Sequence, residues 1–142
     1  MKMRDLKAAK ELLQGGAYTC VLCKDGVSAS TTLRGVMPLI RWLQEGETPR
    51  DFAAADKVVG KATAFLYCLL GAKAVYASVM SRPAIEVLRQ HGIYTECDRQ
   101  VENIINRAGD GICPFEEAVL HMVEPEAAYQ AILAKMEAMG IR

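Results

Sequence analysis

The sequence predicts an α/β domain in which a mixed β-sheet carries helices on both faces. Segments with the three- and four-residue apolar spacing of helices alternate along the chain with short apolar segments typical of strands. Asp25-Gly26 separates two strand-like segments, 18–24 and 27–32, and both residues tolerate the positive φ of a tight hairpin turn. A third segment, 74–80, is apolar almost throughout, as expected of a strand that is covered on both faces.

The first part of the chain predicts a helix, the hairpin and a second helix. The first helix ends at Gly15-Gly16, and its apolar stripe consists of Leu6, Ala9, Leu12 and Leu13. In the second arm of the hairpin, residues 27, 29 and 31 face one side and the hydroxyl residues 28, 30 and 32 face the other, which favours a place at the sheet edge. The segment 36–44 then has helical spacing, and 46–51 is a polar loop.

The centre of the chain predicts a helix, a strand and another helix. A helix is expected from Asp56 to a stop at Gly71, because apolar residues recur with helical spacing at Val58, Val59, Ala62, Phe65, Leu66, Leu69 and Leu70. Gly60 would then lie inside this helix, where close packing against the sheet accounts for it. The strand 74–80 follows, and Ser81 is expected to cap a helix over 82–91.

The last third of the chain completes a sheet of about five strands. The strand candidates are 93–97 and 101–105. They are followed by a turn-rich loop over 106–111, a helix that begins at Cys113-Pro114 and a last helix that begins at Pro125.

Length and composition indicate one domain, 1–142, with a core that needs no metal or disulfide. The chain has 17 basic and 17 acidic residues, and its few aromatic residues do not alternate with basic ones, so no nucleic-acid partner is expected. No apolar segment approaches the roughly 20 residues that span a bilayer, so no membrane partner is expected. Five cysteines in apolar segments, without a signal peptide before them, predict reduced thiols in a cytoplasmic protein.

Cys20 and Cys23 have the spacing of a metal or redox motif. On a strand, however, residues three apart point to opposite faces, so the two thiols are not expected to share a metal ion. A redox pair normally opens a helix after a strand, and this pair does not. We therefore predict that both are packing residues, and no cofactor is expected.

Two predicted helix starts have the groups that bind a phosphate: exposed backbone N–H groups, the positive end of the helix dipole and basic side chains. One start is at Asp56-Lys57, and the other, at Ser81-Arg82, directly follows a strand, where ligands of open α/β sheets gather. The alternative is that these residues are ordinary caps with solvated basic neighbours. The candidate ligand-binding residues are Asp56, Lys57, Lys61, Ser81, Arg82, Asn106 and Arg107.

Cys113 and Glu116 are the candidate catalytic residues. Cys113 immediately precedes Pro114 at a predicted helix start, where the helix dipole favours a thiolate nucleophile. Glu116 lies in the same turn and is a candidate acid or base. No histidine is near in the sequence to activate the thiol, so an ordinary cap residue is the alternative.

Four segments, TCVLCKDG, DKVVGKATA, VYASVMSRPAIEVL and NRAGDGICPFEEAV, resemble an uncharacterised family of domains of unknown function that is grouped by fold with the cytidine deaminases. The resemblance covers about 17–119, and DKVVGKA and the Asn-Arg…Cys-Pro-x-Glu segment are its specific parts. It implies a three-layer α/β/α sandwich with a cytidine-deaminase-like fold.

This sequence departs from the zinc motifs of true deaminases. Those enzymes hold zinc with a His or Cys beside a proton-shuttling Glu at one helix start and with Pro-Cys-x-x-Cys at the next. The corresponding predicted helix starts here are Asp56–Val59 and Arg82–Val87, and neither has an imidazole or a thiol. We therefore expect no zinc and no deamination by that mechanism.

Three hypotheses for function follow. The first is a binding domain that takes a nucleotide or another small phosphorylated ligand in the former active-site cleft. The second is an enzyme of other chemistry that uses Cys113 or Glu116. The third is an oligomeric structural protein with a vestigial cleft. The apolar stripes of both terminal helices are compatible with a homo-oligomer, and packing of these stripes on the sheet is the alternative.

Overall fold

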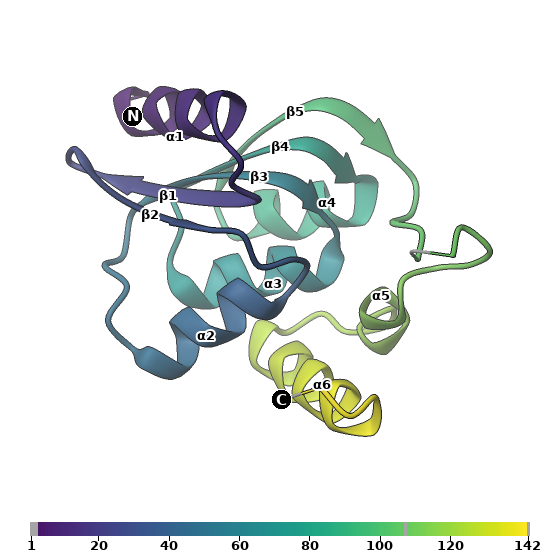
Figure 1. Ribbon diagram of the computed structural model, residues 1–142. Coiled ribbons are helices and arrows are strands. Elements are labelled where there is room, and N and C mark those ends of the chain that lie inside the picture. Colours follow the sequence, from purple (N-terminus) through teal and green to yellow (C-terminus); the bar gives the residue numbers. More distant parts are fainter. Residues whose placement is uncertain (1–2, 107, 142) are drawn as a thin grey trace.

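A mixed five-stranded sheet with helices on both faces forms the centre of the molecule (Figure 1). The computed structural model describes residues 3–106 and 108–141. The strands are β1 (Cys20–Lys24), β2 (Val27–Thr31), β3 (Ala53–Val59), β4 (Ala74–Ser81) and β5 (Tyr94–Val101), and the helices are α1 (Arg4–Gly15), α2 (Met37–Glu45), α3 (Lys61–Leu70), α4 (Arg82–Gln90), α5 (Pro114–Ala118) and α6 (Pro125–Ala138).

The strand order is β2-β1-β3-β4-β5. β1 is antiparallel to both of its neighbours, and β3, β4 and β5 are parallel to one another. β2 and β3 consequently run in the same direction and end at the same edge of the sheet. The predicted mixed sheet, the hairpin and the edge position of its second arm are confirmed.

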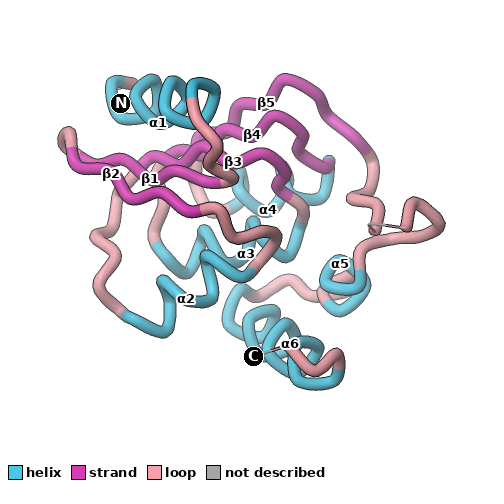
Figure 2. Tube along the Cα trace, in the orientation of Figure 1, coloured by secondary structure: helices cyan, strands magenta, loops and turns pink. Residues whose placement is uncertain are grey.

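Helices cover the two faces of the sheet unequally (Figure 2). α1 packs alone on one face, while α2, α3 and α4 pack on the other, and α6 packs on α3. Cys20 belongs to the core under α2 and α3, and Cys23 belongs to the core under α1. The prediction that these two thiols point to opposite faces is therefore confirmed, and both are free cysteines.

The helix predicted from Asp56 begins too early. Residues 53–59 form the central strand β3, Gly60 is the N-cap and the helix spans Lys61–Leu70 before its stop at Gly71. Gly60 is thus not inside a helix, and Asp56–Val59 is not a helix start. Alanine favours helices, but Ala53–Ala55 are buried between α1 and α3, where small side chains let both layers approach the strand.

The separate strand predicted over 101–105 is also wrong. β5 continues through Val101, and Ile105 forms only an isolated bridge with Ile112. The remaining predicted elements are found within a few residues of their expected limits, including α5 directly after Cys113 and α6 from Pro125.

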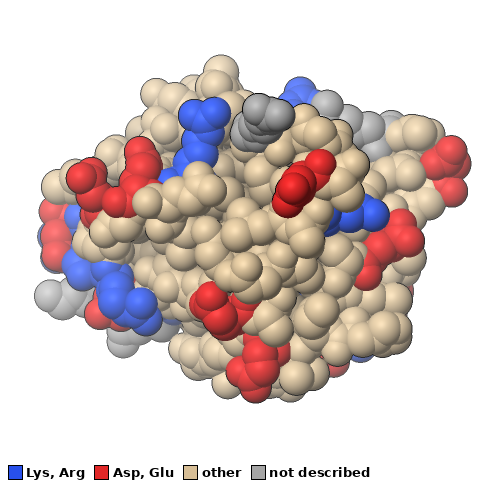
Figure 3. Space-filling model, turned by 90° about the horizontal axis from the view of Figure 1, so that it is seen from below, with Lys and Arg blue, Asp and Glu red and all other residues tan. Residues whose placement is uncertain are grey.

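Charged side chains are scattered with both signs over the face shown in Figure 3, as the balanced composition suggests. This face has no basic patch of the kind that binds nucleic acid. In the described residues, no helix is both long enough and apolar enough to span a lipid bilayer.

Candidate functional site

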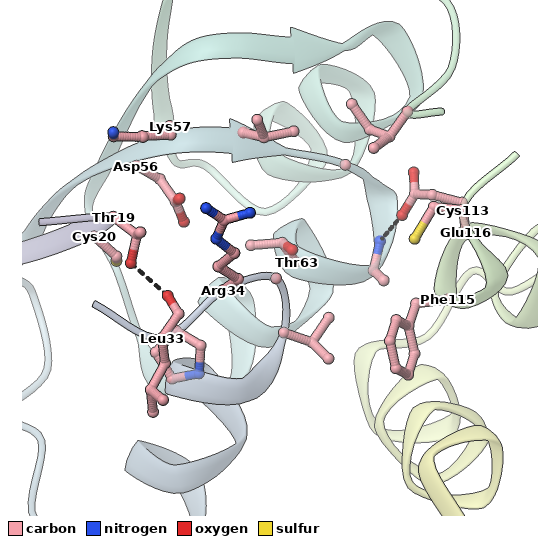
Figure 4. Close-up of a pocket in the computed structure, with 17 residues that line it drawn as sticks. Thr19, Cys20, Leu33, Arg34, Asp56, Lys57, Thr63, Cys113, Phe115 and Glu116 are labelled. Carbon is pink, nitrogen blue, oxygen red and sulfur yellow. Dashed lines mark hydrogen bonds between the residues drawn. The ribbon is translucent and has the colours of Figure 1, made fainter. Parts of the chain in front are cut away.

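A cavity of about 370 Å³ opens at the edge of the sheet where β2 and β3 end (Figure 4). The start of β1, the loop after β2, the starts of α2 and α3, and the segment around α5 contribute its walls. Its lining residues are Thr19, Cys20, Leu33, Arg34, Gly35, Val36, Pro38, Asp56, Lys57, Val58, Gly60, Ala62, Thr63, Ile104, Cys113, Phe115 and Glu116. It lies at the carboxyl end of a parallel strand, which is the usual ligand position in open α/β sheets.

Asp56 provides a buried carboxylate to this cavity. Its side chain is only 8% exposed, and its Oδ2 atom accepts a hydrogen bond from the hydroxyl of Tyr67 at 2.8 Å. The same hydroxyl lies 3.1 Å from the Sγ atom of Cys20. Because β1, β3 and α3 meet here, one side chain from each forms a single hydrogen-bonded group.

Burial shifts the proton affinities of this group. It raises the pKa of Asp56 from 3.8 to about 6, although the hydrogen bonds from Tyr67 and from nearby backbone N–H groups favour the carboxylate. Burial, and after it the charge of Asp56, raises the pKa of Cys20 and of Tyr67 well above their ordinary values. Cys20 and Tyr67 are consequently neutral at physiological pH, and Asp56 is the titratable member of the group.

Glu116 connects α5 to the start of α3. Its two carboxylate oxygens accept hydrogen bonds from the backbone N–H groups of Lys61 at 2.8 Å and Ala62 at 2.9 Å. Gly60 permits this contact, because a Cβ atom at that position would lie 2.5 Å from the Glu116 carboxylate. The anion position at the N-terminus of α3 is therefore occupied by a side chain of the protein itself.

The environment of Glu116 has opposing effects on its proton affinity. Burial raises the pKa of this carboxyl, while the hydrogen bonds from Ala62 and Lys61 and the charge of Lys61 lower it. The ammonium group of Lys61 donates to the carbonyl of Leu120 at 2.9 Å and lies over the ring of Phe65. Lys61 thus supports the segment after α5 and does not line the cavity.

Arg34 and Thr63 are lining residues that the sequence did not identify. Figure 4 shows the guanidinium group of Arg34 and the carboxylate of Asp56 pointing toward one another. Within the described chain the Arg34 guanidinium has no ion pair or hydrogen bond. Thr63 is only 6% exposed and lines the same cavity. The available signal was a basic residue in the loop after an edge strand, but it is informative only once β3 is known to end beside that loop.

The structure brings four of the predicted site residues to the cavity: Asp56, Lys57, Cys113 and Glu116. Figure 4 shows the ammonium group of Lys57 pointing away from the Arg34 guanidinium. Cys113 is half-buried at the N-cap of α5, and neither histidine is a lining residue.

The other predicted residues are placed elsewhere. Ser81 is buried and caps α4 by accepting a hydrogen bond from the N–H group of Ala84 at 3.2 Å, as the sequence predicted. Arg82 is exposed and forms ion pairs with Glu86 and Glu102. The Oδ1 atom of Asn106 accepts hydrogen bonds from backbone N–H groups in its own loop. Arg107 lies outside the described residues.

No group of three or more His, Cys, Asp or Glu side chains suited to a metal ion occurs within 3–106 and 108–141. The acids at the cavity are instead engaged in the hydrogen bonds described above. The cavity wall is largely apolar. Its main polar groups are the unpaired guanidinium of Arg34, the buried carboxylate of Asp56 and the hydroxyl of Thr63.

Comparison with known proteins identifies relatives of unknown function. The family described as TM1506, domain of unknown function (DUF1893), matches residues 8–136. The crystal structure of a DUF1893 family protein, TM1506 from Thermotoga maritima, is similar with a TM-score of 0.85 and 23% sequence identity, over 95% of this chain and 92% of that chain. That likeness shows a shared fold. Among curated proteins there is no significant match.

The first prediction concerns Gly60. In Gly60→Ala the new methyl group displaces the Glu116 carboxylate, so the variant loses the cap of α3 and about 1–2 kcal/mol of unfolding free energy. Gly15→Ala is the matched control, because a Cβ atom at Gly15 contacts nothing within 4 Å. Urea denaturation measures both variants. Equal effects of the two substitutions would contradict the role assigned to Gly60.

The second prediction concerns Asp56 and pH. Because its folded-state pKa is raised, the stability that it contributes is fully present below pH 3.8 and is lost as the pH rises through about 6. The loss amounts to about 3 kcal/mol. Asp56→Asn cannot ionise and is therefore expected to be more stable than the natural protein at about pH 7.5, with this advantage vanishing near pH 4.

Chemical denaturation across this pH range tests the prediction. Glu137→Gln, which removes an exposed acid of α6, controls for the loss of one surface charge. An Asp56→Asn protein whose stability equals that of the natural protein at every pH would show that the pKa of the Asp56 carboxyl is not raised.

Proposed function

The chain belongs to the DUF1893 family of domains of unknown function, and from this premise we propose that its cavity binds a nucleotide or a similar small phosphorylated molecule. The observation that carries the proposal is the unpaired guanidinium of Arg34, directed into the cavity beside Asp56 and the buried Thr63. Arginine binds phosphate oxygens with two parallel hydrogen bonds, and the partial enclosure of the cavity strengthens that interaction.

The proposed position of the phosphate differs from the one that the helix starts suggested. The N-terminus of α3 already binds the Glu116 carboxylate, and Arg82 is engaged by two acids on the surface. Arg34 is therefore the proposed phosphate ligand, with the hydroxyl of Thr63 as a further donor. Neither Lys61 nor the start of α4 takes part.

The rest of the cavity suits the remainder of such a ligand. Apolar side chains, among them Leu33, Val58 and Phe115, offer surfaces for a flat ring, while Asp56 accepts hydrogen bonds from N–H or O–H groups. A volume of about 370 Å³ is in the range of small-molecule sites. A ligand with an anionic end and a donor-bearing ring or sugar fits this combination.

We also propose that the fold of this chain is related to that of the cytidine deaminases but holds no zinc. In deaminases, helix starts beside the substrate supply the zinc ligands. Three helix starts line this cavity, those of α2, α3 and α5. Among them they supply no imidazole and a single thiol, that of Cys113, which is fewer than the three protein ligands that a catalytic zinc needs. We therefore propose binding in place of zinc-dependent hydrolysis.

The third prediction tests the role of Arg34 by isothermal titration calorimetry. A panel of nucleoside monophosphates, ribose 5-phosphate and inorganic phosphate serves as the set of probes. At least one phosphorylated probe is expected to bind, and Arg34→Ala is expected to weaken it about tenfold or more, the usual cost of losing a charged hydrogen bond.

Arg82→Ala is the matched control, since it removes the same side chain from a surface ion pair. It is expected to leave the affinity unchanged. Absence of binding by every probe, or equal weakening in both variants, would contradict the proposal.

A further inference from the structure

The two edges of the sheet are built differently. Native proteins generally protect an exposed edge strand with charges, a proline or a bulge. The β5 edge has such protection from Glu96, Asp98 and Arg99. The β2 edge, Val27–Thr31, has no charge and no proline, and it pairs with β1 in a continuous register without a bulge. It is nevertheless exposed, and the Val27 side chain is 74% accessible.

The turn before β2 determines which backbone groups face outward. Asp25 and Gly26 have φ values of 50° and 84°, which are the positive angles of a type I′ turn. In such a hairpin the residues next to the turn, Lys24 and Val27, form a hydrogen-bonded pair. Because the pattern alternates, the N–H and C=O groups of Ser28 and Ser30 point away from β1 toward the open edge.

The sequence of β2, Val-Ser-Ala-Ser-Thr, reads almost the same in both directions. Valine and threonine at its ends are both β-branched and similar in shape. If two copies pair antiparallel about Ala29, Ser28 of one copy lies opposite Ser30 of the other, and Val27 lies opposite Thr31. The outward backbone groups then face each other in register, and no charge within the strand meets a like charge.

A groove next to this edge provides room for a partner. A cavity of about 490 Å³ lies between the hairpin and α2, and its wall includes Val27, Ala29, Trp42 and Pro49. The apolar side of β2 therefore faces a hollow and not a packed core. In a second β2 strand paired with this edge, Val27, Ala29 and Thr31 would lie on the same face of the sheet. The apolar side of β2 would therefore extend across both copies.

We propose that the chain forms a two-fold symmetric dimer by antiparallel pairing of β2 with β2 of a second copy, which joins the two sheets into one. The partner is a second copy because the edge is neutral and complementary to itself, as a two-fold interface requires. This inference does not rest on the proposed function, since the phosphate site at Arg34 and the pairing at Ser28 and Ser30 are separate.

Charge substitutions at Ala29 test the pairing by sedimentation equilibrium and native mass spectrometry. The natural chain is expected to be dimeric at micromolar concentration. Ala29→Lys and Ala29→Glu each place like charges opposite one another and are expected to weaken the dimer about tenfold. An equimolar mixture of the two variants is expected to restore dimers that contain one copy of each. A monomeric natural chain, or a mixture that does not recombine, would overturn the proposal.

Ser30→Pro is the second test. Proline removes the outward N–H group without removing a hydrogen bond to β1 and is tolerated at such edge positions. It is expected to weaken the dimer at least tenfold, whereas Ser30→Thr, which keeps the N–H group, is expected to remain dimeric. Circular dichroism checks that both variants are folded. A folded Ser30→Pro protein that dimerises like the natural chain would also overturn the proposal.

Discussion

The hydrogen bonds from the start of α3 to the Glu116 carboxylate are the constraint on which the site depends. They attach α5, a helix of five residues that are at most partly buried, to the central unit of the fold. They require a glycine at position 60, since any side chain there would meet the carboxylate. They also bring Cys113 and Phe115 to the cavity as part of its wall. One interaction between segments 55 residues apart thus forms one side of the cavity and satisfies the first N–H groups of α3.

The same interaction decides where an external anion can bind. A helix N-terminus attracts negative charge, but this one has already been neutralised by a carboxylate from within the chain. The remaining cation directed into the cavity is Arg34, which comes from the loop after β2 because β2 and β3 end at the same edge. Asp56, which faces Arg34, is buried beside Tyr67. This burial lowers the stability of the fold at neutral pH, as the raised pKa of Asp56 indicates. A buried acid that lowers stability at neutral pH is the kind of feature that is retained at sites of function.

Much of the fold could be predicted from local sequence signals. The Asp-Gly turn, the cap at Ser81, the helix after Cys113-Pro114 and the opposite directions of Cys20 and Cys23 all follow from rules that act over a few residues. The resemblance to a family of domains of unknown function is confirmed by the match over 8–136, whereas the relation to the cytidine-deaminase fold stays a proposal. The strand β3 could not be predicted in this way. Its alanines favour a helix, and Val58 and Val59 continue the helical spacing of α3 although valine itself favours strands. Pairing with β1 and β4 makes this segment a strand.

The site could be predicted only in part for the same reason. A helix predicted in place of the end of β3 puts the phosphate near Lys61 and Arg82, which form other contacts in the structure. The same prediction gives Arg34 no role. The sequence identifies Asp56, Cys113 and Glu116 as candidate residues near predicted helix starts, but their contacts depend on which strand ends meet. Recognition of Arg34 and Thr63 needs the order of the strands, and no spacing within the sequence contains that information.

The binding claim is tested most directly by mapping a ligand onto the backbone. In a titration of the ¹⁵N-labelled protein with the nucleoside monophosphate that binds best, amide chemical shifts report each residue near the ligand. We expect the largest changes at Arg34, Asp56 and Thr63, with little change at Ser81 and Arg82. Changes confined to the start of α4, or no changes at all, would contradict the account.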